Sequence, residues 1–167
     1  MQRRETVSLN EWAVLGVIVD KPRHGYDVAA ELTPGNPVGD VWRLSRQLVY
    51  RALERLDALG LVEERRTEPG DAAPPRTVYG STRRGRTALH EWLDTPVDHL
   101  RDVRGALLLK LVLNDRLERD RRPLVKAQRQ VFAPLLDALD STPADDDVAG
   151  VWRHHSARAV RAFLADL

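Results

Sequence analysis

The 167-residue chain contains no cysteine. Without thiols it cannot form disulfides, thiolate metal sites or a cysteine nucleophile. It also has no apolar run near the roughly 20 residues that cross a membrane, and residues 1–6 are polar and charged, unlike a signal peptide. These absences predict a cytoplasmic protein with no membrane partner.

Neither sign of charge dominates, because 26 basic residues oppose 25 acidic ones and the net charge is +1. The overall charge therefore gives no indication of a nucleic-acid partner, and a DNA-binding surface must come from where the charges are placed. With 43% hydrophobic and 31% charged residues, the composition is typical of a folded globular protein rather than a disordered chain.

Catalytic and metal-binding motifs are also missing. The sequence contains no phosphate-binding glycine loop, serine elbow or paired-carboxylate motif. His24 lies in a turn without an acid or a second histidine at a suitable spacing. His154 and His155 are adjacent, so on a helix they point about 100° apart and cannot bind one metal together. We expect no enzyme, no metal site and no cofactor.

Proline and glycine divide the first 60 residues into three predicted helices. A capping box, Ser8 to Glu11, begins the first helix, which runs to about residue 19. The second covers residues 26–32 and has Ala29, Ala30 and Leu32 facing inward. Ser45 caps the third, which ends at Gly60. Its predicted inward side chains are Leu48, Val49, Ala52, Leu53, Leu56 and Leu59.

Residues 61–67 and 76–81 favour strands on either side of a tip rich in proline and glycine. Together they predict a β-hairpin. Thr82 then caps a fourth helix that reaches about residue 93.

Three more helices are predicted after residue 95. In the first, residues 106–113 are apolar on nearly every side except at Lys110. This apolar surface is larger than one chain is expected to cover, which favours burial by a second chain. The second, about 123–139, must kink or end at Pro134. The third follows Pro143 and is expected to turn a set of apolar side chains inward: Val148, Val151, Trp152, Ala159 and Phe163.

Helices joined by a turn and followed by a hairpin correspond to a winged helix-turn-helix. We therefore predict a mainly α protein, with a winged helix-turn-helix and two-stranded wing in residues 1–94 and an α-helical dimerisation region in residues 95–167. The third helix presents Arg46, Gln47, Tyr50 and Arg51 outward. Arginine can pair with guanine, glutamine with adenine, and tyrosine with a phosphate. Arg46 also opposes the positive end of the helix dipole, so an anionic partner would stabilise it.

Three segments resemble the PadR family of bacterial repressors. They are the turn His24-Gly25-Tyr26-Asp27, the stretch of the third helix from Leu48-Val49-Tyr50-Arg51-Ala52-Leu53 onward, and the end of the wing, Tyr79-Gly80-Ser81-Thr82-Arg83-Arg84-Gly85. The resemblance covers roughly residues 9–93. It implies a repressor that binds an inverted-repeat operator, with Tyr50 and its neighbours on double-stranded DNA and the C-terminal helices forming a homodimer.

The predicted wing departs from a basic pattern. Glu68 and Asp71 are acidic, which disfavours insertion of the tip into a minor groove, and leaves Arg76 as the wing residue expected at the DNA backbone. Arg83 and Arg84, at the start of the fourth helix, are further candidates for phosphate contact.

Two questions stay open at this stage. The resemblance implies an effector site near the junction of the two halves, so Trp12 and Trp92 are candidates to line a small-molecule site, but core packing is the better explanation of both. The alternative function is a winged-helix module that binds another protein rather than DNA, which the neutral net charge keeps open.

Overall fold

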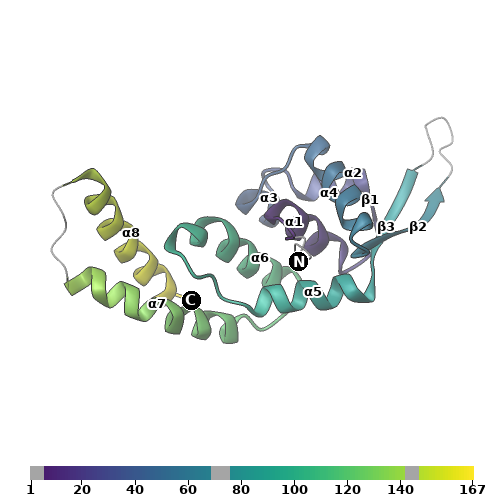
Figure 1. The fold of residues 1–167 in the computed structure, drawn as a ribbon. Helices are drawn as coiled ribbons and strands as arrows, with labels where there is room; N and C mark the ends of the chain where they lie inside the picture. The colour runs from purple at the N-terminus through teal and green to yellow at the C-terminus, as the bar shows by residue number, and fades with distance from the viewer. Residues whose placement is uncertain (1–5, 69–75, 142–146) are drawn as a thin grey trace, which may run out of the picture. The chain divides into compact units, whose positions relative to one another are not determined.

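The computed structural model describes residues 6–68, 76–141 and 147–167 (Figure 1). The chain forms two compact units, Met1–Trp92 and Leu93–Leu167. None of the described helices is long and apolar enough to cross a membrane.

The N-terminal unit contains five helices and three strands among its described residues, which confirms the predicted winged-helix plan. In chain order they are α1 (Leu9–Ile18), β1 (Arg23–His24), α2 (Gly25–Glu31), α3 (Pro37–Val41), α4 (Arg46–Ala58), β2 (Val62–Glu68), β3 (Arg76–Ser81) and α5 (Arg83–Asp94).

The wing is larger than predicted. The sheet has three strands in the order β1-β3-β2, with both pairs antiparallel. β1 pairs Arg23 with Tyr79 and His24 with Val78. The sequence did not indicate this strand because two residues are too short to show an alternating pattern.

The short helix α3 was also missed. Pro37 was interpreted as a chain break, but it occupies the first turn of α3, where a missing backbone N–H has no cost. Two further predictions were wrong, because Ala30 is exposed and Leu48 is only partly covered. Four predicted apolar positions of α4 do face the core, as its buried residues show: Val49, Ala52, Leu53 and Leu56. Leu59, at the C-cap, is only half-buried.

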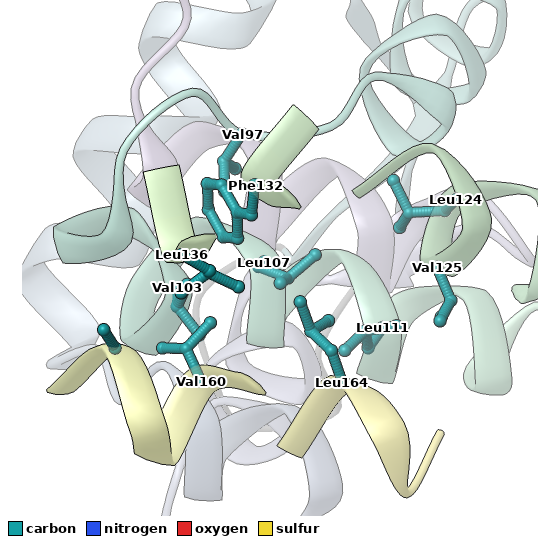
Figure 2. Close-up of a cluster of buried hydrophobic side chains, with 11 residues drawn as sticks. Val97, Val103, Leu107, Leu111, Leu124, Val125, Phe132, Leu136, Val160 and Leu164 are labelled. Atoms are coloured by element: carbon teal, nitrogen blue, oxygen red, sulfur yellow. The ribbon is translucent and has the colours of Figure 1, made fainter. Parts of the chain in front are cut away.

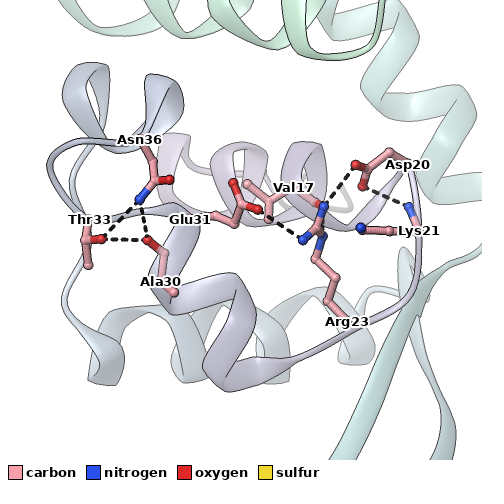
Figure 3. A network of polar contacts seen from close by, with 8 residues as sticks. All are labelled: Val17, Asp20, Lys21, Arg23, Ala30, Glu31, Thr33 and Asn36. Carbon is pink, nitrogen blue, oxygen red and sulfur yellow. Dashed lines mark hydrogen bonds and ion pairs between the residues drawn. The ribbon is translucent and has the colours of Figure 1, made fainter.

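Arg23 holds three segments of the N-terminal unit together (Figure 3). Its Nε donates to the Val17 carbonyl oxygen at 3.1 Å, at the end of α1. Its Nη1 pairs with Glu31 on α2 and its Nη2 with Asp20, each at 3.1 Å. Since β1 carries Arg23, this side chain fixes the turn between α1 and α2.

The ends of α4 are fixed by caps. Ser45 accepts a hydrogen bond from the Leu48 N–H. At the other end Gly60 has a φ of +66°, a conformation that favours glycine. The Thr82 hydroxyl donates to the Gly60 carbonyl oxygen at 2.8 Å and accepts from the Gly85 N–H. Thr82 thus caps α5, as predicted, and ties it to the end of α4.

The C-terminal unit begins with irregular turns before the first of the helices predicted after residue 95. Its elements are η1 (Leu100–Asp102), η2 (Val103–Leu107), α6 (Leu108–Arg116), α7 (Arg122–Ser141) and α8 (Val148–Ala165). Here η1 is a 3₁₀ turn and η2 a π-helical turn. Of the two predicted effects of Pro134, a kink or an end, the end is excluded, because α7 continues through this residue.

The core of this unit is a cluster contributed by η2, α6, α7 and α8 (Figure 2). Phe132 is fully buried in it, beside Leu107 and Leu136. Gly150, Ala157, Val160 and Leu164 form the buried side of α8. The prediction for α8 was wrong, because Val148 and Trp152 are 88% and 72% exposed. The buried side of α8 combines two small residues with Val160 and Leu164, and the exposed apolar side chains lie on the opposite face.

The argument from residues 106–113 to a second chain was also wrong. Within a single chain, Leu107, Leu109, Leu111 and Leu113 are all at most 5% exposed. Among the described residues of the C-terminal unit, the large apolar side chains that are exposed lie on α7 and α8.

A buried polar cluster holds the segment that leads into the C-terminal unit. The side-chain amide of Gln128 donates to the Val97 carbonyl oxygen and accepts from the Val97 N–H, each at 2.8 Å. The Lys110 ammonium, on a side chain only 2% exposed, donates to the Thr95 carbonyl oxygen at 2.7 Å. Burial lowers the pKa of Lys110 to about 8, although the nearby carboxylate of Asp94 opposes the change.

The lowered pKa of Lys110 predicts a pH-dependent stability. Between pH 8 and 10.5 the unfolded chain keeps a proton on this lysine that the folded protein has released. The free energy of unfolding therefore gains a contribution from Lys110 that rises with pH across this window. Urea titrations at several pH values should show the rise in the wild type relative to Lys110→Met. The exposed Lys126→Met is the control, and parallel profiles for the wild type and Lys110→Met would contradict the assignment.

Candidate nucleic-acid interface

The first two turns of α4 carry the residues predicted to read DNA. Arg46, Gln47, Tyr50 and Arg51 are all exposed, on the side opposite to the buried face of this helix. The first turn of α4 contains no acidic residue. Four side chains that can donate hydrogen bonds are thus presented together at the helix end whose dipole favours an anion.

Tyr50 is held in place by the residue that begins α2. A Cβ atom built on Gly25 would lie 2.7 Å from Tyr50 Cε1 and 3.1 Å from its hydroxyl oxygen. Only glycine leaves room for the ring in this position. Tyr50 is nevertheless 39% exposed, so the contact fixes the ring without hiding it.

Sequence reasoning missed Tyr26, which follows Gly25 in the first turn of α2. Its side chain is 59% exposed, and the Arg46 guanidinium lies over its ring at 4.9 Å from the centroid. Such a cation–π contact contributes about 0.5 to 1 kcal/mol at an exposed site. It positions Arg46 and adds an aromatic hydroxyl to the surface. The sequence signal for it was the His-Gly-Tyr motif, which had been interpreted only as a turn.

The second half of α4 has a different character. Glu54 and Asp57 are exposed there, beyond the four donor side chains. Tyr79, on β3, lies within electrostatic reach of α4: burial raises its pKa, with smaller contributions from Glu64 and Tyr50. On α4 itself, the four exposed donor side chains therefore lie in the first two turns, apart from the carboxylates of Glu54 and Asp57.

In the wing, the fold itself engages one basic side chain, that of Arg65. Arg65 sits at an irregularity in the β2–β3 register, where it pairs with Glu63 at 2.8 Å and donates to the Ser81 carbonyl oxygen. It also lies across Gly80, where a Cβ would come within 2.7 Å of its Nε. Arg76 belongs to β3 and pairs with Glu68 in the backbone register. The side chains of Glu68 and Arg76 lie outside the described part of the structure, as does the whole of Asp71.

The two arginines at the start of α5 differ in their surroundings. Arg84 Nη1 donates to the Leu59 carbonyl oxygen at 2.9 Å and so completes the cap of α4. Arg83 is exposed. Of the pair, Arg83 is the one whose position suits a phosphate.

Trp12 and Trp92 stack on each other, with ring centroids 5.0 Å apart and an angle of 12° between the planes. Each ring therefore covers a face of the other, which accounts for both residues as packing groups. Within the part of the chain that the structure describes, no three histidine, aspartate or glutamate side chains gather as metal ligands.

Comparison with known proteins identifies a family match for most of the N-terminal unit. Residues 14–91 match the sequence model of the transcriptional regulator PadR-like family. This segment is a PadR-like domain. Its Gly25, Tyr26 and Tyr50 are the residues that bring α2 and α4 together at the candidate surface. No protein of curated function matches the sequence.

Solved structures of PadR proteins resemble the whole chain. One is Bacillus subtilis PadR in complex with operator DNA, at 18% identity, covering 95% of this chain and 96% of that one, with a TM-score of 0.52. Bacillus subtilis PadR in complex with p-coumaric acid is 16% identical, covering 98% and 96%, with a TM-score of 0.45. The PadR-like regulator BC1756 from Bacillus cereus is 17% identical, covering 99% and 97%, with a TM-score of 0.43. At these identities the first likeness shows a shared fold.

The contact between Gly25 and Tyr50 leads to a test. Gly25→Ala should displace the Tyr50 ring, because its Cβ would overlap Cε1. Steric overlap with the ring should destabilise the fold by about 1 to 3 kcal/mol, whereas replacing glycine by alanine in a helix stabilises it by about 1 kcal/mol. Because the two effects on stability oppose each other, the position of the Tyr50 ring is the better readout. The chain has three tyrosines, which makes NMR assignment of the Tyr50 ring practical. The exposed change Ala30→Ser is the control, and unshifted Tyr50 resonances in Gly25→Ala would contradict the packing.

Proposed function

We propose that the protein is a cytoplasmic, dimeric repressor that binds an inverted-repeat operator through α4. The observation that carries the proposal is the exposed group of Arg46, Gln47, Tyr50 and Arg51 at the start of the second helix of a helix-turn-helix, in a PadR-like domain. The shared fold with Bacillus subtilis PadR, a protein that binds operator DNA, supports it.

Each side chain has a role suited to its chemistry. Arg46 and Arg51 can pair with guanine or with a phosphate, and Gln47 with adenine. Tyr50, held against Gly25, is a pre-positioned donor to a phosphate oxygen. Because the ring lies against Gly25, its packing restricts the side chain before binding and lowers the entropy lost on binding. Arg76 remains the proposed backbone contact from the wing.

The proposed dimer interface is the exposed apolar surface of α7 and α8, not the apolar stretch that includes α6. Val131 and Leu135 on α7, and Val148, Val151 and Trp152 on α8, are all exposed in the single chain. Exposed apolar side chains in groups mark association surfaces. A two-fold dimer would set two α4 helices about 34 to 36 Å apart, one turn of the duplex, which matches an inverted repeat.

A protein-binding module is the second candidate. Glu54 and Asp57 on α4, together with a net charge of +1, favour it more than a basic helix would. The salt dependence of binding separates the two functions, because DNA affinity falls steeply with salt as phosphate contacts are lost.

The α4 assignment predicts that Tyr50→Ala with Arg51→Ala will abolish tight operator binding. Each lost contact should cost about 1 to 3 kcal/mol if it reaches a base. Both side chains are exposed, so the variant should fold. The measurement is fluorescence anisotropy with a duplex that the wild type recovers from a random-sequence pool, at several salt concentrations.

The matched control replaces two exposed groups outside the N-terminal unit, Gln130→Ala and Arg158→Ala. It removes the same single charge and should bind as the wild type does. A folded Tyr50→Ala, Arg51→Ala variant with unchanged affinity would overturn the assignment of α4. If no duplex is recovered at all, the protein-binding alternative gains the support.

The dimer surface is tested on α8. Val148→Glu with Val151→Glu places two charges on exposed apolar positions, where burial against a second chain would leave them without compensation. Sedimentation should change from dimer to monomer, and operator affinity should fall by orders of magnitude because two linked heads bind more tightly than one. Lys126→Glu with Gln130→Glu, at exposed polar positions of α7, is the control. A dimer that survives the α8 changes places the interface elsewhere.

A further inference from the structure

One aliphatic side chain interrupts the polar surface at the beginning of α4. The other branched aliphatic residues of this helix, Val49, Leu53 and Leu56, are buried in the core of the N-terminal unit, whereas Leu48 is 37% exposed. The fold therefore leaves part of the Leu48 side chain available to a partner.

The cap of α4 holds Leu48 in the first turn of the helix. The Leu48 N–H donates to the Ser45 hydroxyl oxygen at 3.4 Å, in the cap that begins α4. The N-terminal residues of a recognition helix are the ones that contact base edges in the major groove. Leu48 is thus placed in the part of α4 where contacts to bases are expected.

The neighbours of Leu48 on the helix surface can donate hydrogen bonds. Gln47 directly precedes it, and Arg51 adjoins it because residues three apart lie next to each other on a helix. Tyr50 lies two residues further along, about 200° round the helix axis, and so belongs to the other flank with Arg46. The first two turns therefore combine one flank formed by Arg46 and Tyr50 with an apolar patch at Leu48.

This combination suits the edge of a base pair better than it suits a protein surface. The first turn of α4 contains no acidic residue, so the charge around Leu48 is complementary to a polyanion. In the major groove, thymine presents an apolar group, its 5-methyl, beside hydrogen-bond acceptors. An apolar protein surface that covered Leu48 would also cover the donors of Gln47 and Arg51 and leave them without acceptors, which is unfavourable.

We propose that Leu48 is a further specificity-determining residue, whose side chain contacts the 5-methyl group of one thymine in each half-site of the operator. Leucine neither donates nor accepts hydrogen bonds through its side chain. Any other base at this position would lose the apolar contact, and its polar edge would lose water without gaining a partner. The inference rests on the proposed binding of an operator through α4, and it adds one apolar contact to the polar contacts proposed for that helix.

The test removes the methyl group alone. The full chain is titrated with the duplex that the wild type recovers from a random-sequence pool, and fluorescence anisotropy measures the affinity. Each thymine is replaced in turn, in both half-sites, by deoxyuridine, which lacks only the 5-methyl group. Burial of one such group corresponds to about a fourfold change in affinity. At one thymine position the replacement should therefore weaken wild-type binding about fourfold for each half-site, or about fifteenfold for the two together.

Leu48→Ala should remove this sensitivity at the same position. Alanine is too short to reach the methyl group, so the variant should bind the thymine and uracil duplexes equally well. Leu48→Met keeps an apolar side chain of similar length and should discriminate as the wild type does. A purely structural role for Leu48 would instead lower the affinity of Leu48→Ala for both duplexes alike and leave their ratio unchanged.

The matched control is Leu59→Ala, the same truncation at the half-buried C-cap of α4. It should keep the wild-type ratio of affinities for the thymine and uracil duplexes. The inference is overturned if no thymine of the operator is sensitive to loss of its methyl group, or if Leu48→Ala discriminates as the wild type does. Loss of discrimination in Leu59→Ala as well would also overturn it. A wild type that recovers no duplex would overturn the proposed function and this inference with it, whereas an operator bound without any role for a thymine methyl group overturns this inference alone.

Discussion

The contact between the Tyr50 ring and Gly25 is the constraint on which the candidate DNA surface depends. It requires α2 to begin with a residue that has no side chain, and it places the ring where its hydroxyl remains accessible. Because α2 is itself fixed by Arg23 through Glu31, the position of Tyr50 is linked to the turn after α1. Exposed side chains on a helix are normally free to rotate, so a packed yet accessible tyrosine is a pre-organised contact.

Much of the N-terminal unit could be predicted from local signals. The Ser8 and Thr82 caps, the Ser45 cap and the left-handed Gly60 all involve residues close in sequence, so their chemistry is visible without the fold. What could not be predicted depends on distant partners. The strand β1 exists only because β3 lies beside it. Likewise, Arg84 had been considered for phosphate contact, but it completes the cap of α4 from 25 residues away.

The C-terminal unit was less predictable because its helices have apolar residues on more than one side. For α8 the large side chains suggested one buried face, whereas the structure buries the face that contains Gly150 and Ala157. Small residues at a helix–helix contact allow the two backbones to pack closely. A hydrophobicity pattern does not show this packing, because it depends on side-chain size rather than on apolar character. A sequence pattern therefore indicates that α8 has an apolar face to cover, but which face the same chain covers depends on α7 and η1.

The arginines of the chain show how a structure separates stabilising groups from groups that await a ligand. Arg23, Arg84 and Arg129 each donate to a backbone carbonyl oxygen at the end of a helix or beside it, so their charge serves the fold. Among the residues that the structure describes, the contact of Arg46 is with the Tyr26 ring, which satisfies its charge in part. With 26 basic residues in a nearly neutral chain, composition could not distinguish these cases. The distinction comes from which donors of each guanidinium group the fold already uses.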